Sequence, residues 1–365
     1  LKSTKWTFTR RSLKKRSALR VSASFWTPKT WTSMPQDKLD SQLGLFPDDV
    51  PAARPAGVGP ATPPAPLAAL ASRIPPGVRL GTSSWSFPGW QGIVYDKQAS
   101  EEMLAREGLT AYAAHPLLRT VSIDRSFYRP LSADQFRSYA DAVPSDFRLV
   151  VKADRLVTSP VDPDARGVRT ANPRFLDPIY AAEEVVAPTL DGLGPKAGPI
   201  VFQFPPIPPN LVGGRSAFLE RLHRFLVALP RPCLYAVELR TPAFITEAYA
   251  RLLENTGVAH CYNVHPASAP LARQIELIHP YQQPALVVRW MLGSGLEYVA
   301  AKERYEPFDR LVDEDLPSRE LIARTVLDAT LAERDAFVIA NNKAEGSAPL
   351  TLFRLAERIA NWERR

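Results

Sequence analysis

Short apolar runs that favour β-structure recur through the chain from Val78 onward, and each is followed by a segment with helical periodicity. Continuous apolar strands covered by helices are typical of a parallel sheet buried on both faces. Eight such units within residues 78–365 predict a closed (β/α)₈ barrel, with an open doubly wound sheet as the alternative. The expected strands are 78–83, 120–124, 147–153, 198–204, 234–239, 258–264, 285–291 and 336–341.

Two of the intervening helices have clear end signals. Ser132 is expected to cap a helix over residues 133–143. Thr241 and Pro242 supply a cap and a first-turn proline for a helix that runs from 243 and stops at Gly257. Helices of this length fit between consecutive strands of a barrel.

The chain divides into three parts by composition. Residues 1–33 hold nine Lys and Arg and no acid, and residues 47–76 include nine prolines. Proline fixes φ and removes a donor, so we expect 34–77 to be a disordered Pro/Ala-rich linker before a single domain over 78–365. For the basic leader, an over-extended gene start with Met34 as the natural first residue is favoured over a targeting segment or a nucleic-acid-binding arm.

The net charge of +7 comes from the leader. Without residues 1–33 the chain carries 36 basic and 38 acidic side chains. A protein that binds a phosphate backbone usually has a basic surface, so nucleic acid is not a favoured partner. Two cysteines, Cys233 and Cys261, are too few for a disulfide framework, which fits a reducing cytoplasm. A membrane partner is not expected, because there is no run of about 18 apolar residues.

Six segments near the ends of the predicted strands carry motifs of low chance frequency. They are RLGTSSWSFPGW at 79–90, TVSIDRSFYR at 120–129, FRLVVKADRLVT at 147–158, GPIVFQFPP at 198–206, YAVELRTPAF at 235–244 and IANNKAEGSAP at 339–349. In this order they resemble the YecE-like proteins, which carry the domain of unknown function 72. The resemblance covers roughly Val78 to Trp362. It implies a TIM-like barrel and no settled activity.

This chain departs from the family pattern at three strand ends. Where the family commonly reads VEINSTFYR, Ser122 and Asp124 replace Glu and Asn. After the seventh strand the family often shows RLHG, but 289–293 reads RWMLG, without histidine. At the sixth strand a common acidic position gives way to the neighbourhood of Asn263 and His265. Family roles that need those groups are in doubt here.

Active sites of such barrels lie at the carboxyl ends of the strands, where this sequence places many polar and aromatic groups. We expect catalytic roles for Glu238, Lys152 and Asp124. The expected substrate-binding residues are Trp85, Tyr128, Gln203, Arg240, Asn263, His265, Arg289, Asn341 and Asn342.

The spacing of these residues suggests their chemistry. Glu238 and Arg240 are two positions apart, so both can face the barrel interior and form either a clamp for a carboxylate or phosphate or a structural ion pair. Lys152 follows three apolar residues, and poor solvation would suit a base, a Schiff-base amine or an oxyanion partner. The alternative for Lys152 is a salt bridge with Glu238 or Asp124.

The sequence leaves the cofactor open and predicts no metal ligand. A zinc cluster is not favoured, because His265 is the one histidine placed well, with Asp124 and Glu238 as its companions. A single divalent metal held by carboxylates stays open. A small anionic ligand is the expected partner, and the oligomeric state is not predicted.

Three functions remain as alternatives. The first is an enzyme, a hydrolase or lyase, acting on a small anionic or nucleotide-like substrate. The second is a nucleic-acid-binding or phosphodiester-cleaving protein similar to barrels of the endonuclease IV type, which is an analogy of fold. The third is a non-catalytic binding module.

Overall fold

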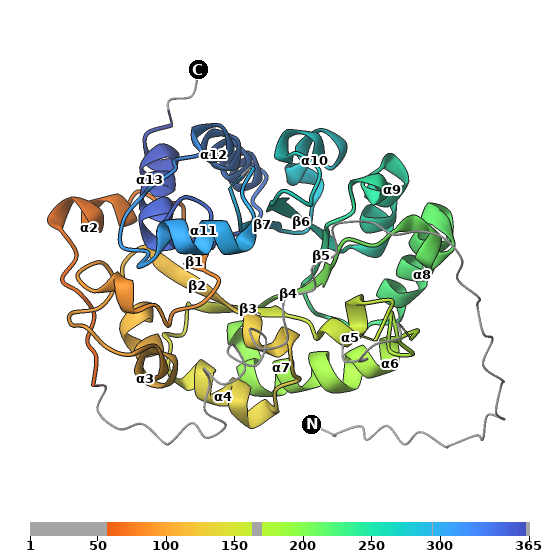
Figure 1. The fold of residues 1–365 in the computed structure, drawn as a ribbon, viewed down its shortest axis with the longest axis horizontal. Helices are drawn as coiled ribbons and strands as arrows, with labels where there is room; N and C mark the ends of the chain where they lie inside the picture. Colours follow the sequence, from red (N-terminus) through yellow and green to blue (C-terminus); the bar gives the residue numbers. More distant parts are fainter. Residues whose placement is uncertain (1–56, 163–169, 294, 363–365) are drawn as a thin grey trace. The chain divides into compact units, whose positions relative to one another are not determined.

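The computed structural model describes residues 57–162, 170–293 and 295–362. In these ranges eight strands pair in parallel in sequence order, and β8 returns to pair with β1 (Figure 1). The closed barrel that the sequence predicts is therefore confirmed, and the open sheet is excluded. The strands are β1 Val78–Thr82, β2 Leu118–Ile123, β3 Arg148–Lys152, β4 Ala197–Phe204, β5 Tyr235–Leu239, β6 Ala259–Val264, β7 Leu286–Trp290 and β8 Ala336–Ala340.

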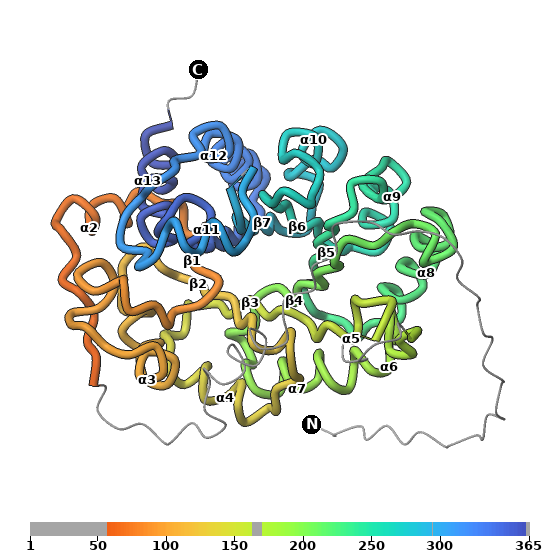
Figure 2. The backbone as a smooth tube through the Cα atoms, in the orientation of Figure 1, coloured from red at the N-terminus to blue at the C-terminus, as the bar shows by residue number. Residues whose placement is uncertain are grey.

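Helices follow each strand and surround the barrel, as the tube in Figure 2 shows. The longer ones are α3 Glu101–Ala113, α4 Ala133–Asp141, α8 Gly214–Ala228, α9 Glu247–Thr256, α12 Leu316–Leu331 and α13 Ala348–Ala360. The shorter α-helices are α2 Ala65–Ala71, α5 Arg155–Thr158, α6 Pro178–Ala181, α7 Ala187–Leu193, α10 Leu271–Leu277 and α11 Tyr298–Tyr305. A π-turn, η3 Ala182–Val186, joins α6 to α7. The 3₁₀ turns are η1 Pro88–Trp90, η2 Asp124–Phe127, η4 Gly194–Lys196, η5 Pro209–Val212, η6 Pro242–Phe244 and η7 Pro280–Gln282.

Of the two predicted helix starts, one is confirmed and one is wrong. Ser132 caps α4, and Gln135 completes a capping box. Thr241 and Pro242 instead begin the separate turn η6. The backbone then extends at Ile245, and Thr246 caps α9. The helix stops at Gly257 as predicted, with φ of +61°.

Apolar side chains form two layers around the strands. The larger cluster lies between the strands and the surrounding helices. A smaller cluster fills the barrel interior, with one or two residues from each of β3 to β8. Because side chains alternate along a strand, residues two positions beyond the interior layer also point inward, at the carboxyl ends of the strands. The interior layer contains Val150, Val201, Ala236, Ala259, Cys261, Val287, Met291, Phe337 and Ile339.

The described end of the expected linker is folded. Residues 65–71 form α2, and Val58 and Leu70 are buried against the barrel domain. Arg73 donates to the carbonyl of Ala360 at 2.6 Å, which ties the end of α2 to α13. The Ala- and Leu-rich segment between the prolines has good helix propensity and an apolar side chain to bury, which explains the difference. The expectations for the leader and for residues 34–56 lie outside the described residues.

Within the described ranges, no helix is long and apolar enough to cross a membrane. Both cysteines are free. Cys261 belongs to the barrel-interior layer, and Cys233 is partly buried.

A candidate ligand site at the carboxyl ends of the barrel strands

The alternation of the strands brings most of the expected polar residues together. Several of them lie two positions beyond an apolar interior residue, as Glu238 lies beyond Ala236 and Arg289 beyond Val287. The register of the strands also brings these residues together, because Gln203 pairs with Glu238 and Asn263 pairs with Arg289 in neighbouring strands. We call the resulting group the rim cluster. It consists of Asp124, Lys152, Gln203, Glu238, Arg240, Asn263, His265 and Arg289.

Glu238 is the centre of the rim cluster and is fully buried. Its Oε1 accepts from Arg240 Nε at 2.9 Å and from the side-chain amide of Asn263. Its Oε2 accepts from Arg289 Nη1 at 2.8 Å. Burial alone would raise the pKa of Glu238, but attraction to Arg289 and Arg240 outweighs burial and lowers the pKa to about 2. A carboxylate with both oxygens occupied and a low pKa positions the arginines and is poorly suited to act as a base.

Arg289 links two carboxylates. Its Nη2 donates to Asp124 Oδ2 at 2.9 Å, while its Nη1 also donates to Gln203 Oε1 at 3.2 Å. Burial would lower the pKa of this guanidinium, but Asp124 and Glu238 raise it instead. Asp124 is held on its other side by Ser122, whose hydroxyl donates to Oδ1 at 2.5 Å. Ser122, a departure from the family pattern, thus orients an expected site residue.

Arg240 and His265 present unsatisfied donors to each other. The Nδ1 atom of His265 accepts from the backbone N–H of Ala267 at 3.0 Å, so the neutral ring carries its proton on Nε2. That nitrogen lies 3.5 Å from Arg240 Nη1, which is also a donor. Burial and the charge of Arg240 lower the pKa of His265 to about 4, so the ring stays neutral. Neither N–H group has an acceptor among the described residues.

Lys152 is the buried lysine of the rim cluster. Its Nζ lies 3.6 Å from the centre of the Phe127 ring, and it makes neither an ion pair nor a hydrogen bond with the described residues. The pKa of Lys152 is lowered to about 7, chiefly by burial; Asp124 and Glu238 oppose this shift, and Arg289 and Arg240 contribute to it. The salt bridge considered from the sequence is therefore not formed.

Above the buried part of the rim cluster lie partly exposed groups that a ligand can reach. The side chains of Asp124 and Arg240 are 29% and 18% exposed. Tyr128 is also partly exposed. Its pKa is raised to about 12 by burial and then by Asp124 and Tyr298. Asn341 donates to Ser83 Oγ at 2.8 Å and accepts from Lys343.

Two expected residues lie away from the rim cluster. Trp85 is buried, donates to the carbonyl of Leu104 at 3.0 Å and packs edge-on against Tyr139. Asn342 belongs to the outward face of its strand, where it accepts from Trp90 Nε1 at 3.3 Å and from the Ala348 backbone at 2.8 Å. Both side chains are buried in the packing between strand and helices, away from the rim cluster, and their substrate-binding roles stay a prediction.

Other residues at this end of the barrel were not predicted. Tyr298 of α11 lies 4.2 Å from Lys343 Nζ, and Phe308 lies on the other side of that ammonium at 5.8 Å. No motif marks Tyr298, because α11 belongs to an insertion between β7 and α12. Phe127 is the last residue of η2, and its place three residues after Asp124 in the sequence was the available signal.

Among the described residues, no group of three or more His, Cys, Asp and Glu converges as metal ligands. The two carboxylates of the rim cluster, Asp124 and Glu238, both face Arg289. A guanidinium occupies the place between them that a cation would take. These residues therefore do not fit a carboxylate-bound divalent metal in the arrangement observed.

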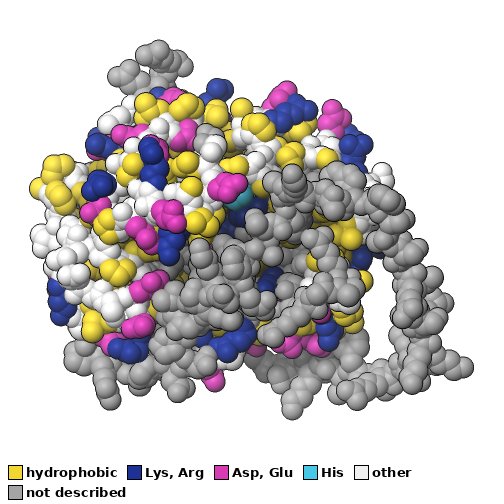
Figure 3. Space-filling model, viewed as in Figure 1, with side chains coloured by type: hydrophobic (Ala, Val, Ile, Leu, Met, Phe, Trp, Pro, Cys, Tyr) yellow, Lys and Arg dark blue, Asp and Glu magenta, His cyan; other side chains and the backbone are white. Residues whose placement is uncertain are grey.

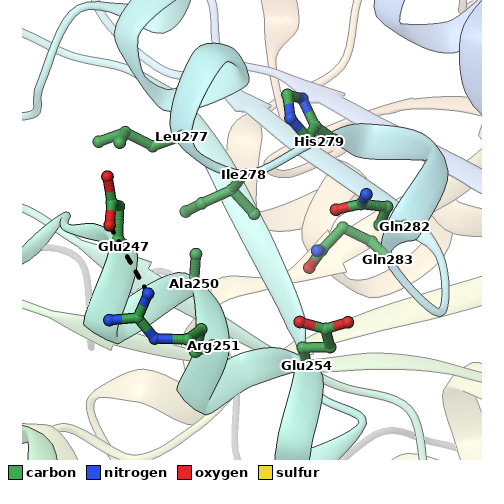
Figure 4. Close-up of a pocket in the computed structure, with 9 residues that line it drawn as sticks. All are labelled: Glu247, Ala250, Arg251, Glu254, Leu277, Ile278, His279, Gln282 and Gln283. Atoms are coloured by element: carbon green, nitrogen blue, oxygen red, sulfur yellow. Dashed lines mark ion pairs between the residues drawn. The ribbon is translucent and has the colours of Figure 1, made fainter.

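A separate groove of about 200 Å³ lies outside the barrel between α9 and η7 (Figure 4). Its charged residues are exposed, and Arg251 pairs with Glu247 (Figure 4). On the face in Figure 3, basic and acidic side chains are interspersed, without a field of one sign. The rim cluster, with its buried and unsatisfied donors, is the stronger candidate for a ligand site.

Comparisons with known proteins agree on the fold. A family model described as "Protein of unknown function DUF72" matches residues 79–365. A solved DUF72 family protein from Thermotoga maritima MSB8 is 19% identical, with a TM-score of 0.53 over 77% of this chain and 98% of that one. Another, from Enterococcus faecalis V583, is 18% identical, with a TM-score of 0.52 over 79% and 97%. None of the curated proteins matches this chain.

Proposed function

Since this chain belongs to the DUF72 family of proteins of unknown function, we propose a function from its own side chains: the rim cluster binds a small anionic or nucleotide-like ligand. The observation that carries the proposal is the pair of donors formed by Arg240 Nη1 and His265 Nε2, 3.5 Å apart. Both side chains are partly exposed, and neither N–H group has an acceptor among the described residues. An anionic oxygen placed between them would accept from both.

The rest of the rim cluster supports an anion at this position. Glu238 and Gln203 fix the Arg240 guanidinium through Nε and Nη2, which leaves Nη1 for a ligand. Such preorganisation reduces the entropy lost when an anion binds. Lys152 lies in the same cluster and makes no ion pair with the described residues, so its Nζ remains for a ligand to contact. The partly exposed ring of Tyr128, which packs edge-on against Phe127, lies where the organic part of a nucleotide-like ligand would stack.

Calorimetric titration with pyrophosphate and with AMP tests the proposal. We expect both to bind, and we expect Arg240→Gln to weaken both at least tenfold, because the guanidinium donors are lost. Tyr128→Leu should weaken AMP and leave pyrophosphate unchanged. Arg251→Gln is the matched control, because Arg251 is an exposed arginine in an ion pair outside the barrel. Equal affinities in Arg240→Gln and Arg251→Gln, or no binding by the unmodified protein, would refute the proposed site.

A further inference from the structure

The five lysines of the described ranges differ in what holds their amino groups. Lys97 is exposed, and Lys302 pairs with Glu306 at 3.3 Å. Lys196 donates to the carbonyls of Ala140 and Val143 at 2.6 and 2.7 Å, which occupies its amine in joining two elements. Lys343 lies between aromatic rings and is 3.5 Å from Asn341 Oδ1. Lys152 alone among the five is buried without a hydrogen bond or an ion pair.

This placement has no evident structural use. A buried ammonium without a carboxylate partner destabilises the fold, because burial removes its hydration and only a ring face replaces part of it. Carboxylates lie in the same cluster, but hydrogen bonds from Arg289, Arg240 and Ser122 occupy Glu238 and Asp124. An amine kept apart from its potential counter-ions keeps its lone pair available at neutral pH.

We propose that Lys152 is a nucleophile that condenses with the carbonyl carbon of a small anionic aldehyde or ketone to form an imine. The inference rests on the proposed function, because the anionic part of this substrate would lie at Arg240 and His265. It extends that function by assigning the substrate class and a covalent step. The charged groups that act on the Lys152 amine are Asp124 from the end of β2, Glu238 and Arg240 from β5 and Arg289 from β7.

The step balances without any further reactant. The neutral amine of Lys152 attacks the carbonyl carbon, which forms the C–N bond and leaves the electron pair of the C=O bond on oxygen. A proton passes from nitrogen to that oxygen by exchange with solvent, since hydrogen bonds occupy both oxygens of Asp124. The carbinolamine then takes one proton from solvent, its C–O bond breaks, and water leaves. The product is a protonated imine on Nζ.

The fraction of Lys152 that can attack follows from its environment. Burial lowers the pKa of its ammonium to about 7, so a large part of the amine is neutral at pH 7. Exposed lysines have pKa values near 10 and are almost fully protonated there. We therefore expect the reaction to favour Lys152 over Lys97 and Lys302, although those two are far more accessible.

Reductive trapping tests the proposal on the full chain. The protein is incubated at pH 7 with glyoxylate or with the neutral aldehyde propanal, in the presence of sodium cyanoborohydride, and the adducts are located by peptide mass spectrometry. We expect the adduct on Lys152 to form at least tenfold faster than on Lys97 or Lys302 with either probe. Excess pyrophosphate should slow the glyoxylate reaction. Lys302→Met is the control and should leave the Lys152 adduct unchanged.

The two proposals fail in different ways. Labelling of Lys152 no faster than the exposed lysines, with both probes and in a protein that binds pyrophosphate, would refute the nucleophile and leave the anion site standing. Rapid labelling of Lys152 by propanal in a protein that binds no pyrophosphate would support the nucleophile and refute the anion site. Because the adduct is mapped on the unmodified chain, the test does not depend on whether a Lys152 variant folds.

Discussion

Glu238 shows how one buried side chain can hold several others in place. Its two oxygens fix Arg240, Arg289 and Asn263, which come from three neighbouring strands. Two arginines buried next to each other would repel, and the carboxylate between them offsets that repulsion. Removal of the carboxylate would therefore leave the repulsion between the two guanidinium groups without this compensation.

We predict that Glu238→Gln lowers the free energy of unfolding by about 3–5 kcal/mol, the usual cost of removing one partner of a buried ion pair. Urea unfolding at pH 7.5 measures the change. Glu276→Gln is the control, since Glu276 forms an exposed pair with Arg273 and should change stability by no more than about 0.5 kcal/mol. If Glu238→Gln lowers the free energy of unfolding no more than the control does, the attraction within the buried ion pairs only balances the cost of removing their charges from water.

The identities of the rim-cluster residues could be predicted from sequence, but their contacts could not. Period-two alternation placed Glu238 and Arg240 on one face, and the observed ion pair agrees. The choice between a salt bridge and an unpaired Lys152 depended on distances across the barrel that one sequence does not contain. The sequence suggested that Trp85 faces a ligand, whereas its ring packs against Tyr139. An aromatic residue after a strand can turn toward the helices as well as toward a ligand.

At the scale of elements, two adjacent asparagines follow β8. Because side chains alternate along a strand, the two point to opposite faces of the barrel wall. Asn341 continues the inward face of Ile339, and Asn342 continues the outward face of Ala340. Neighbouring residues of one type thus serve different purposes. Asn341 belongs to the site end of the barrel, whereas Asn342 joins η1 to the start of α13.

We predict that Asn342→Ala destabilises the protein by about 1–3 kcal/mol for each of the two buried donors that lose their acceptor, the Trp90 indole and the Ala348 backbone. Its affinity for pyrophosphate should not change. Thermal unfolding and the same calorimetric titration give both quantities. Asn341→Ala is the matched comparison, and an equal loss of stability there would contradict the assignment of the two faces.

Sequence patterns predicted the strands better than the insertions. The strands follow from apolar runs of β-favouring residues, and each observed strand overlaps its prediction. The start of α9 was placed too early, because Thr241 and Pro242 begin a short turn that does not continue into the helix, and the Thr241 hydroxyl bonds the Ile207 backbone instead of capping. The insertion that contains α11 has no periodic signal of its own. Its apolar residues, among them Leu292 and Tyr305, form a separate small cluster.

For the whole molecule, buried histidines link stability to pH. Burial lowers the pKa of His115, His260 and His265 to about 4 each, against about 6.5 in an unfolded chain. Between pH 6.5 and 4 the unfolded chain therefore binds more protons than the folded one. The free energy of unfolding therefore rises with pH across this window and falls as the solution is acidified. Above pH 6.5 these three histidines do not make the free energy of unfolding depend on pH.

We predict that unfolding in urea at pH 5.5 takes up protons, and that the free energy of unfolding falls steadily from pH 6.5 to 4.5. Potentiometric measurement in unbuffered solution counts the protons. Glu101 and Glu345, whose pKa values burial raises, release protons over the same range and reduce the net uptake. A net release of protons at pH 5.5 would contradict the neutral histidines.

Barrel closure has a consequence for synthesis. Val78 of β1 pairs with Ala336 of β8, so the first strand cannot complete its pairing until the last strand has been synthesised. Until β8 has been made, a nascent chain has open edges at β1 and β7, and unpaired strand edges are where chains associate wrongly. The long sequence separation also makes this pairing slow to form. A ribosome that stalls before β8 would leave a fragment whose open strand edges favour aggregation.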